Sequence, residues 1–345
     1  MLQGTHGARI SLSPVCNRTK NMRPRLFCAI LVAVTLALAS SAGALSLDEV
    51  NKAELTKPSA KDSRAVNLKA QVLLDRLGFS SGAIDGRRSD NFASALRAFQ
   101  EQNGLSTSGA LDAATWKKLT ESPEPALIEY TISAVDTKGP FVAEIPDSYE
   151  KKAELKRLDY TGPIELLAER FHMNEDLLRQ LNRGKSFDQA GTVITVANVG
   201  VKPVALRTKV AKVEVDKTRK SVRALAADGK LLAFYPASIG SEEKPAPSGK
   251  LKVVRVARGP TYTYNPEFKF RGVKADRELK IAAGPNNPVG SVWIALNQKS
   301  YGIHGSAEPA KVGKVDSHGC VRMTNWDALA LAALVRKGTV VEFIE

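Results

Sequence analysis

Apolar residues recur at helical spacing in the first third of the chain. Between residues 65 and 120 they fall three or four positions apart, as at Val66, Leu73 and Leu77, which predicts an amphipathic helix. Gly78 then provides a stop signal for this helix. Two further helices are expected at residues 92–99 and 112–119. We therefore expect a compact three-helix module over residues 65–120.

From residue 207 onward apolar and polar residues alternate, and this period predicts β-strands. Strands are expected at residues 210–215, 222–226, 231–239, 251–257, 292–296 and 340–343. Asp228-Gly229, which lies between two of these strands, is a strong signal for a two-residue hairpin turn. The C-terminal part of the chain is therefore expected to be rich in antiparallel strands.

A single helix is clearly marked within this β-rich region. Thr324 can cap its N-terminus, with Asp327 three residues later, and Gly338 can end it. Its apolar face is expected to carry Leu329, Ala330, Ala333 and Leu334. Residues 207–344 are therefore expected to form a mostly-β domain with one prominent helix.

Less regular segments separate these regions. Residues 45–64 are polar with mixed charge and are expected to form a tether. Residues 121–158, which open with Ser-Pro-Glu-Pro, are expected to form a linker. Residues 159–200 indicate a small α+β unit, because two helical stretches precede a strand-like run at 193–196. The fold class is therefore multidomain.

The first 44 residues have the pattern of a secretory signal peptide. Arg23 and Arg25 precede an apolar run of about 14 residues, which is too short to span a bilayer comfortably. Small residues follow and end at Ala44, after which we expect cleavage. Met22 offers a second start codon, and a retained membrane anchor is the alternative interpretation. A cleaved protein would have no membrane span and would lie in the periplasm or cell envelope.

Charge and cysteine content change once this segment is removed. The formal charge of the 345-residue chain is +14, and loss of the five basic residues in 1–44 leaves +9. The remaining basic residues are scattered, so the sequence gives no indication of a nucleic-acid partner. Two of the three cysteines, Cys16 and Cys28, also lie in 1–44. The mature chain therefore keeps Cys320 as its single thiol and can form no intramolecular disulfide.

The residues around this thiol form two motifs, His304-Gly305 and Ser317-His318-Gly319-Cys320-Val321-Arg322. A thiolate is a strong nucleophile, and a nearby imidazole can take the proton of its thiol. His304, which follows a strand-like run, and His318 are both candidates for this base. Gly319 lets the backbone turn beside the thiol, so that the N–H groups of Gly319 and Cys320 can form an oxyanion hole. Arg322 can hold a substrate carboxylate or brace the loop.

Two other interpretations of these residues stay open. Cys320 can be a buried structural thiol with incidental histidine neighbours. A zinc site would need a third ligand, and no Cys-x-x-Cys or His-x-Glu pattern supplies one. The isolation of one thiol in an exported chain favours a catalytic use.

The two motifs resemble those of the L,D-transpeptidase catalytic domain of the YkuD type. In that family a His-Gly pair precedes a Ser-His-Gly-Cys string, which is followed by valine or isoleucine and then arginine. Pro247-Ser248-Gly249, residues 284–290 and Trp293-Ile294 add secondary matches. The resemblance covers residues 207–344 and implies a YkuD-like fold there.

This resemblance also implies a role for each motif residue. Cys320 would be the nucleophile and His304 the proton donor and acceptor. The backbone carbonyl of Gly305 would orient the imidazole. The resemblance assigns the oxyanion hole to His318 and Gly319. It assigns substrate contacts to Ser317 and Arg322. It implies no metal and no other cofactor.

The N-terminal modules resemble wall-binding units. Residues 65–120 resemble the three-helix type of peptidoglycan-binding domain, through the motifs Leu77-Gly78-Phe79, Ile84-Asp85-Gly86, Phe99-Gln100, Gly104-Leu105 and Thr115-Trp116. Residues 159–200 resemble a LysM glycan-binding repeat, with Gly162-Pro163-Ile164 in place of the usual opening Gly-Asp-Thr. Most of the matching positions are expected to be core or turn residues.

Together the resemblances imply a peptidoglycan L,D-transpeptidase of the cell envelope. Its thiolate would be acylated by a tetrapeptide stem with release of D-Ala, and the acyl group would pass to an amine to give a 3-3 cross-link. Its partners would be peptidoglycan stem peptides and glycan. Three alternatives remain: an L,D-carboxypeptidase or cross-link hydrolase, a transferase that attaches a lipoprotein, and a non-catalytic wall-binding protein.

Overall fold

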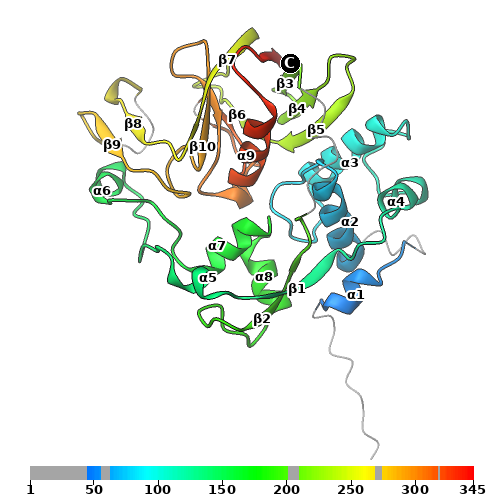
Figure 1. Ribbon diagram of the computed structural model, residues 1–345. Coiled ribbons are helices and arrows are strands. Elements are labelled where there is room, and N and C mark those ends of the chain that lie inside the picture. The colour runs from blue at the N-terminus through cyan, green and yellow to red at the C-terminus, as the bar shows by residue number, and fades with distance from the viewer. Residues whose placement is uncertain (1–44, 56–62, 201–209, 269–273, 318) are drawn as a thin grey trace, which may run out of the picture. The chain divides into compact units, whose positions relative to one another are not determined.

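The computed structural model describes residues 45–55, 63–200, 210–268, 274–317 and 319–345, which belong to one unit, Gly43–Glu345 (Figure 1). The expected signal segment, residues 1–44, lies outside the described residues. Within the described part, no helix has both the length and the apolar character needed to cross a membrane.

The three-helix module is present as predicted. It consists of α2 (Arg64–Arg76), α3 (Asp90–Gln102) and α4 (Ala113–Leu119). Ser89 and Asp112 cap α3 and α4 by accepting hydrogen bonds from backbone N–H groups of the first turn. Phe99 and Trp116 are buried in the shared core. The sequence pattern therefore gave the right helices here, because capping residues and apolar spacing agree.

A second unit combines two strands with two helices. Its elements are β1 (Leu127–Thr131), α7 (Pro163–Arg170), α8 (Glu175–Leu181) and β2 (Val193–Ala197). The two strands pair antiparallel, and Leu127 lies opposite Ala197. The predicted helix–helix–strand order is confirmed. The glycan-binding role suggested by the LysM resemblance stays a prediction.

The expectation of a plain linker at 121–158 is wrong. This segment contains β1, α5 (Ala134–Lys138) and α6 (Tyr149–Glu154). The expected tether at 45–64 also contains a helix, α1 (Leu47–Asn51), whose Val50 is fully buried. The side chain of Asn51 donates to the carbonyl of Leu127 and accepts from its N–H, at 2.9 and 2.8 Å. Tertiary contacts thus stabilise α1 and β1, and local periodicity in the sequence does not reveal such contacts.

The C-terminal domain is built on a nine-stranded sheet with the order β5-β4-β3-β13-β7-β10-β11-β12-β6. These strands are β3 (Lys212–Asp216), β4 (Ser221–Leu225), β5 (Leu231–Pro236), β6 (Ser238–Ile239), β7 (Gly249–Arg258), β10 (Val292–Leu296), β11 (Gly302–His304), β12 (Val321–Arg322) and β13 (Val340–Ile344). A separate hairpin pairs β8 (Tyr262–Tyr264) with β9 (Leu279–Ile281). The predicted turn at Asp228-Gly229 joins β4 to β5. The mostly-β prediction is confirmed.

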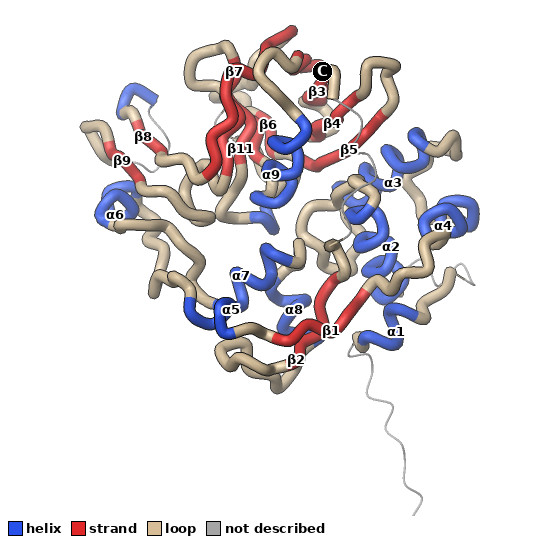
Figure 2. Tube along the Cα trace, in the orientation of Figure 1, coloured by secondary structure: helices blue, strands red, loops and turns tan. Residues whose placement is uncertain are grey.

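The prominent helix is α9 (Asn325–Leu334), and it covers the sheet (Figure 2). Thr324 caps it as predicted, since its hydroxyl accepts from the N–H of Asp327 at 3.1 Å. The predicted apolar face is only partly right, because Leu329 and Leu334 pack against the core whereas Ala330 and Ala333 are exposed. The residues that enter the core are Ala328, Leu331 and Ala332. Leucine and alanine occupy all sides of this helix, so its sequence does not distinguish the buried side.

Polar side chains from all three modules meet at the N-terminal end of α9. Asp327 accepts from the hydroxyl of Ser80 at 2.9 Å, and Asp75 lies 2.9 Å from the Nδ1 of His172. Burial and neighbouring Asp75 together raise the pKa of Asp327 to about 7, although His172 opposes this shift. Burial likewise raises the pKa of Glu169 to about 8. These carboxyl groups therefore bind protons more tightly in the folded chain.

The free energy of unfolding is expected to fall as the pH rises through these values. A carboxyl group with a raised pKa stabilises the fold fully below its unfolded pKa, and this contribution is lost as the pH rises through its folded pKa. The raised pKa of His172 acts in the same direction. Urea denaturation at about pH 5 and about pH 9 should show a loss of at least about 1 kcal/mol. The loss should be smaller in Asp327→Asn, and a rise in stability over this range would contradict the assignment.

Candidate functional site

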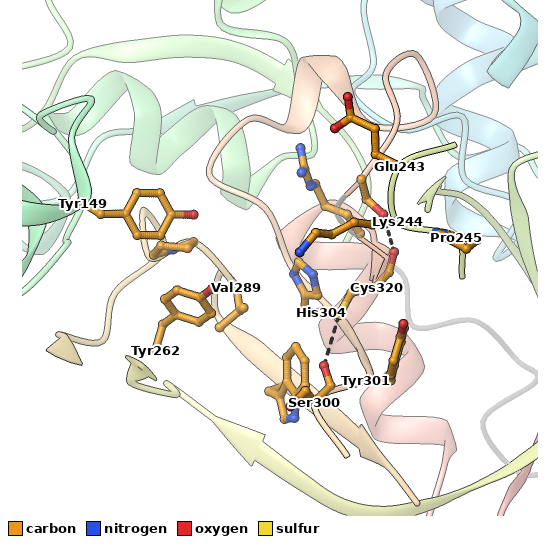
Figure 3. Close-up of a pocket in the computed structure, with 14 residues that line it drawn as sticks. Tyr149, Glu243, Lys244, Pro245, Tyr262, Val289, Ser300, Tyr301, His304 and Cys320 are labelled. Atoms are coloured by element: carbon orange, nitrogen blue, oxygen red, sulfur yellow. Dashed lines mark hydrogen bonds between the residues drawn. The ribbon is translucent and has the colours of Figure 1, made fainter. Parts of the chain in front are cut away.

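Cys320 and His304 line one pocket of about 410 Å³ (Figure 3). The pocket is lined by Tyr149, Glu243, Lys244, Pro245, Tyr262, Pro288, Val289, Trp293, Ser300, Tyr301, His304, Ser317, Cys320 and Arg322. Most of these residues come from the loops and strand ends around β10, β11 and β12. The pocket therefore brings together residues from both predicted motifs.

Strand pairing places the thiol beside the histidine strand. β11 and β12 run parallel, with Ile303 opposite Val321. Cys320 immediately precedes β12, and Gly319 before it has a φ of +101°, a conformation that a residue with a side chain rarely adopts. The Cys320 thiol donates to the carbonyl of Ser300 at a sulfur–oxygen distance of 3.6 Å. The backbone turn thus directs the thiol into the pocket.

His304 is held in one orientation. Its Nδ1 lies 2.7 Å from the backbone carbonyl of Gly305. A carbonyl only accepts hydrogen bonds, so Nδ1 carries the proton and Nε2 is left as an acceptor. The imidazole stacks on Trp293, with ring centroids 5.5 Å apart and planes 22° apart. This arrangement presents a basic nitrogen in a fixed position.

The shifted pKa values favour an uncharged His304 imidazole and an uncharged Cys320 thiol at neutral pH. Burial and the nearby charge of Arg322 together lower the pKa of His304 to about 4, although the Gly305 carbonyl opposes the shift. Burial raises the pKa of the Cys320 thiol, while the Gly302 N–H and Arg322 oppose this rise. A neutral thiol beside a neutral imidazole is suited to proton transfer during attack, rather than to a stored thiolate–imidazolium pair.

The remaining predicted site residues have different surroundings. Ser317 is buried, and its hydroxyl accepts from the Gly240 N–H at 2.7 Å and donates to the Cys320 carbonyl at 2.5 Å. It therefore braces the cysteine loop. Arg322 lies on β12 and lines the pocket. His318 lies outside the described residues, so its predicted place in an oxyanion hole has no structural counterpart here.

Asn325 is a supporting residue that sequence reasoning missed. Its Oδ1 accepts from the Ser291 N–H at 2.9 Å, and its Nδ2 donates to Glu169 at 2.8 Å. A Cβ added to Gly305 would lie only 2.1 Å from this Oδ1. Asn325 therefore packs directly against the residue whose carbonyl holds His304. Its only sequence signal was its place at the start of a helix, which does not indicate this contact.

Replacing Asn325 with alanine is expected to slow acylation of Cys320 by about tenfold or more, because the Gly305 carbonyl loses its support. Rapid-quench measurement of the acylation rate with a carbapenem would test this. The acid side of the pH–rate profile should also shift, since the imidazole environment changes. Asn198→Ala is a matched control, because Asn198 bonds to Pro125 outside the pocket. Equal rates in wild type and Asn325→Ala would contradict the role.

A metal centre finds no support in the described part of the chain. No group of three or more His, Cys, Asp or Glu side chains is placed there to hold a metal ion.

The structure thus joins a helical module to a mostly-β domain whose pocket contains a cysteine and a histidine. Residues 211–343 match the L,D-transpeptidase catalytic domain family (YkuD), and residues 68–119 match the peptidoglycan binding domain family. The chain therefore contains an L,D-transpeptidase catalytic domain preceded by a peptidoglycan-binding domain. The predicted families of these two domains and the mostly-β fold of the catalytic domain are confirmed, whereas no family match supports the LysM-like unit at 159–200.

Curated relatives carry matching names. The chain is 37% identical over 89 residues to the "Putative L,D-transpeptidase YkuD" of Bacillus subtilis, which covers 26% of this chain and 51% of that protein. It is 26% identical over 190 residues to the "Probable L,D-transpeptidase YbiS" of Escherichia coli, covering 54% of this chain and 61% of that protein. The matches thus span about half to three fifths of these relatives.

Solved structures titled L,D-transpeptidase are also similar to the chain. L,D-transpeptidase 3 from Mycobacterium tuberculosis, in complex with a faropenem-derived adduct, has 16% identity and a TM-score of 0.33, over 47% of this chain and 77% of that one. The L,D-transpeptidase from Xylanimonas cellulosilytica has 16% identity and a TM-score of 0.34, over 81% of this chain and 92% of that one.

Proposed function

We propose that this protein is a peptidoglycan L,D-transpeptidase that uses Cys320 as its nucleophile and His304 as its proton donor and acceptor. The observation that carries the proposal is the shared pocket in which His304, fixed on the Gly305 carbonyl, and Cys320 both lie. The catalytic-domain match over 211–343 supports the same reaction class.

The reaction begins with acylation. The sulfur of Cys320 attacks the carbonyl that joins the L-centre of meso-diaminopimelate to D-Ala in a tetrapeptide stem, while Nε2 of His304 takes the thiol proton. The tetrahedral oxyanion accepts hydrogen bonds from the backbone N–H groups of Gly319 and Cys320. The C–N bond then breaks, His304 passes the proton to the leaving amine, and D-Ala departs. The product is a thioester on Cys320.

Transfer completes the cycle. The side-chain amine of a second stem attacks the thioester and loses a proton to His304. The C–S bond breaks, and the proton returns to the sulfur of Cys320. The new amide is the 3-3 cross-link. The energy of the cleaved amide is retained in the thioester, so the cycle requires no nucleotide and no metal. Ser317 keeps the loop in place, and Arg322 attracts a substrate carboxylate.

The N-terminal modules fit an enzyme that works on an insoluble polymer. The peptidoglycan-binding domain at 68–119 would hold the catalytic domain near its substrate and raise the effective concentration of stem peptides. We propose that residues 159–200 add a second glycan contact, as their LysM resemblance suggests. Both roles require a location outside the cytoplasm, in agreement with the expected signal peptide.

Product analysis of purified muropeptides tests the proposal. We expect wild-type protein, incubated with tetrapeptide-bearing muropeptides, to release D-Ala and to form 3-3 cross-linked dimers that mass spectrometry identifies. Tripeptides without dimers would indicate an L,D-carboxypeptidase, and loss of existing dimers would indicate a cross-link hydrolase. In a parallel reaction that contains a lipoprotein, attachment through its lysine would indicate a lipoprotein-attaching transferase. Binding to peptidoglycan without any reaction would indicate a wall-binding protein and overturn the proposal.

A further inference from the structure

One wall of the pocket comes from outside both family-matched regions. Tyr149 lines the pocket, yet it lies between residues 68–119 and 211–343. It is the first residue of α6, which is capped by Ser148 and packs against β9. The catalytic domain alone would therefore leave this side of the pocket incomplete.

The segment that carries Tyr149 is anchored firmly to the catalytic domain. Leu158 is fully buried, and its N–H donates to the carbonyl of Ala283 at 3.0 Å. The carbonyl of Leu158 accepts from the N–H of Asn286, also at 3.0 Å. The side chain of Asn286 in turn donates to the carbonyl of Asp159 at 3.0 Å. These bonds join the segment to the same loop that carries Val289 of the pocket wall.

Aromatic packing fixes the position of Tyr149 itself. Its ring meets Tyr262 and Tyr264 edge to face, with centroids 6.0 and 5.5 Å apart. Tyr264 is almost completely buried. Such contacts hold a ring in one orientation before any substrate arrives. In Figure 3, Tyr149 and Tyr262 lie on the opposite side of the pocket from Cys320.

A positive charge accompanies this apolar wall. Arg322 lines the same pocket. Burial raises the pKa of Tyr149 and the charge of Arg322 opposes this rise, whereas burial lowers the pKa of His304 and Arg322 adds to that shift. Arg322 is thus close to the aromatic wall as well as to the reacting pair. Aliphatic carbons pack well on aromatic rings, whereas a carboxylate pairs well with a guanidinium. The pocket therefore suits a peptide side chain in which methylene groups precede a carboxylate.

We propose that Tyr149 is a substrate-binding residue of this enzyme, contacting the methylene groups of the acyl-donor side chain while Arg322 pairs with the carboxylate at its end. The proposal rests on the transpeptidase function proposed above. It makes residues 121–158, which lie between the two matched domains, part of the substrate site. Substrate binding then depends on a residue that the catalytic-domain match does not include.

Steady-state D-Ala release from a tetrapeptide stem tests the proposal in the full chain. Tyr149→Ala removes the ring and is expected to raise KM about tenfold while kcat changes little. Tyr149→Phe keeps the ring and is expected to stay within about threefold of the wild-type KM. Tyr130→Phe is the matched control, because Tyr130 bonds to Asp136 and does not line the pocket.

A second substrate and a small thiol reagent complete the test. The KM increase in Tyr149→Ala should persist for a stem with lysine in place of diaminopimelate, because the methylene contact is the same. The rate of Cys320 labelling by iodoacetamide should stay unchanged, since this reagent needs no peptide contact. A wild-type KM in Tyr149→Ala, or parallel losses in labelling and turnover, would overturn the proposal. Absence of D-Ala release by the wild type would instead refute the proposed function.

Discussion

Replacing Cys320 with alanine is expected to lower cross-link formation by at least about 1,000-fold, because no other group in the mechanism can form the thioester. Muropeptide analysis after a long incubation would measure the residual rate. The sulfur is the only group removed, and Cys320 has few bonds to lose besides its weak contact with the Ser300 carbonyl. The variant should therefore keep its fold, its thermal transition and its binding to insoluble peptidoglycan.

This combination of results separates catalysis from binding. If Cys320→Ala retained more than about a tenth of the wild-type rate, the nucleophile would be misassigned. If the variant also lost peptidoglycan binding, the loss of cross-links would be explained by failed attachment or folding. The core around Phe99 and Trp116 also includes Leu225, Leu231 and Phe234 of the catalytic domain but not Cys320, so we expect binding to survive.

Replacing His304 with asparagine is expected to lower the acylation rate by about 100- to 10,000-fold, the range typical of a lost general base. The wild-type pH–rate profile should show its acid limb near pH 4, because burial lowers the pKa of His304 to about that value. The imidazole is neutral above this pH and accepts a proton, and activity falls as the pH falls below it. Single-turnover acylation by a carbapenem would measure both effects.

The pH of this acid limb tests both the role of His304 and its protonation state before substrate binds. A limb near the ordinary histidine pKa of 6.5 would mean that His304 is more hydrated than its burial implies. If the acid limb of the wild type persisted in His304→Asn, the group that titrates there would not be His304. Thiolate absorbance at neutral pH would contradict the neutral pair, because burial raises the Cys320 pKa.

The sequence predicted those parts of the fold whose signals are local. The α9 N-cap at Thr324 depends on neighbouring residues and was predicted correctly. The hairpin at Asp228-Gly229 was also placed correctly, but the Ala226 N–H donates to the Lys230 carbonyl, so its loop is longer than the predicted two-residue turn. The strand β1 was missed because its partner β2 lies more than 60 residues away and its stability comes from that pairing. The buried side of α9 was misassigned in part because its leucines and alanines surround the helix.

The candidate site also contains residues with local sequence signals and residues whose roles depend on tertiary packing. Two short motifs contain Cys320 and His304, so their chemistry could be inferred from spacing and residue type. Asn325 and Tyr149 lie outside these motifs, and their relevance arises only where α9 and α6 pack beside the pocket. Such contributions depend on tertiary packing, which no periodicity in one sequence reports.

Intact-protein mass spectrometry of a quenched reaction tests the central claim most directly. The full chain would be mixed with a tetrapeptide stem and no amine acceptor, quenched in acid, and digested to locate any adduct. The account predicts a mass increase equal to the tripeptide acyl group, carried by the peptide that contains Cys320 and absent from Cys320→Ala. Release of D-Ala without any adduct on Cys320, or an adduct on another residue, would contradict it.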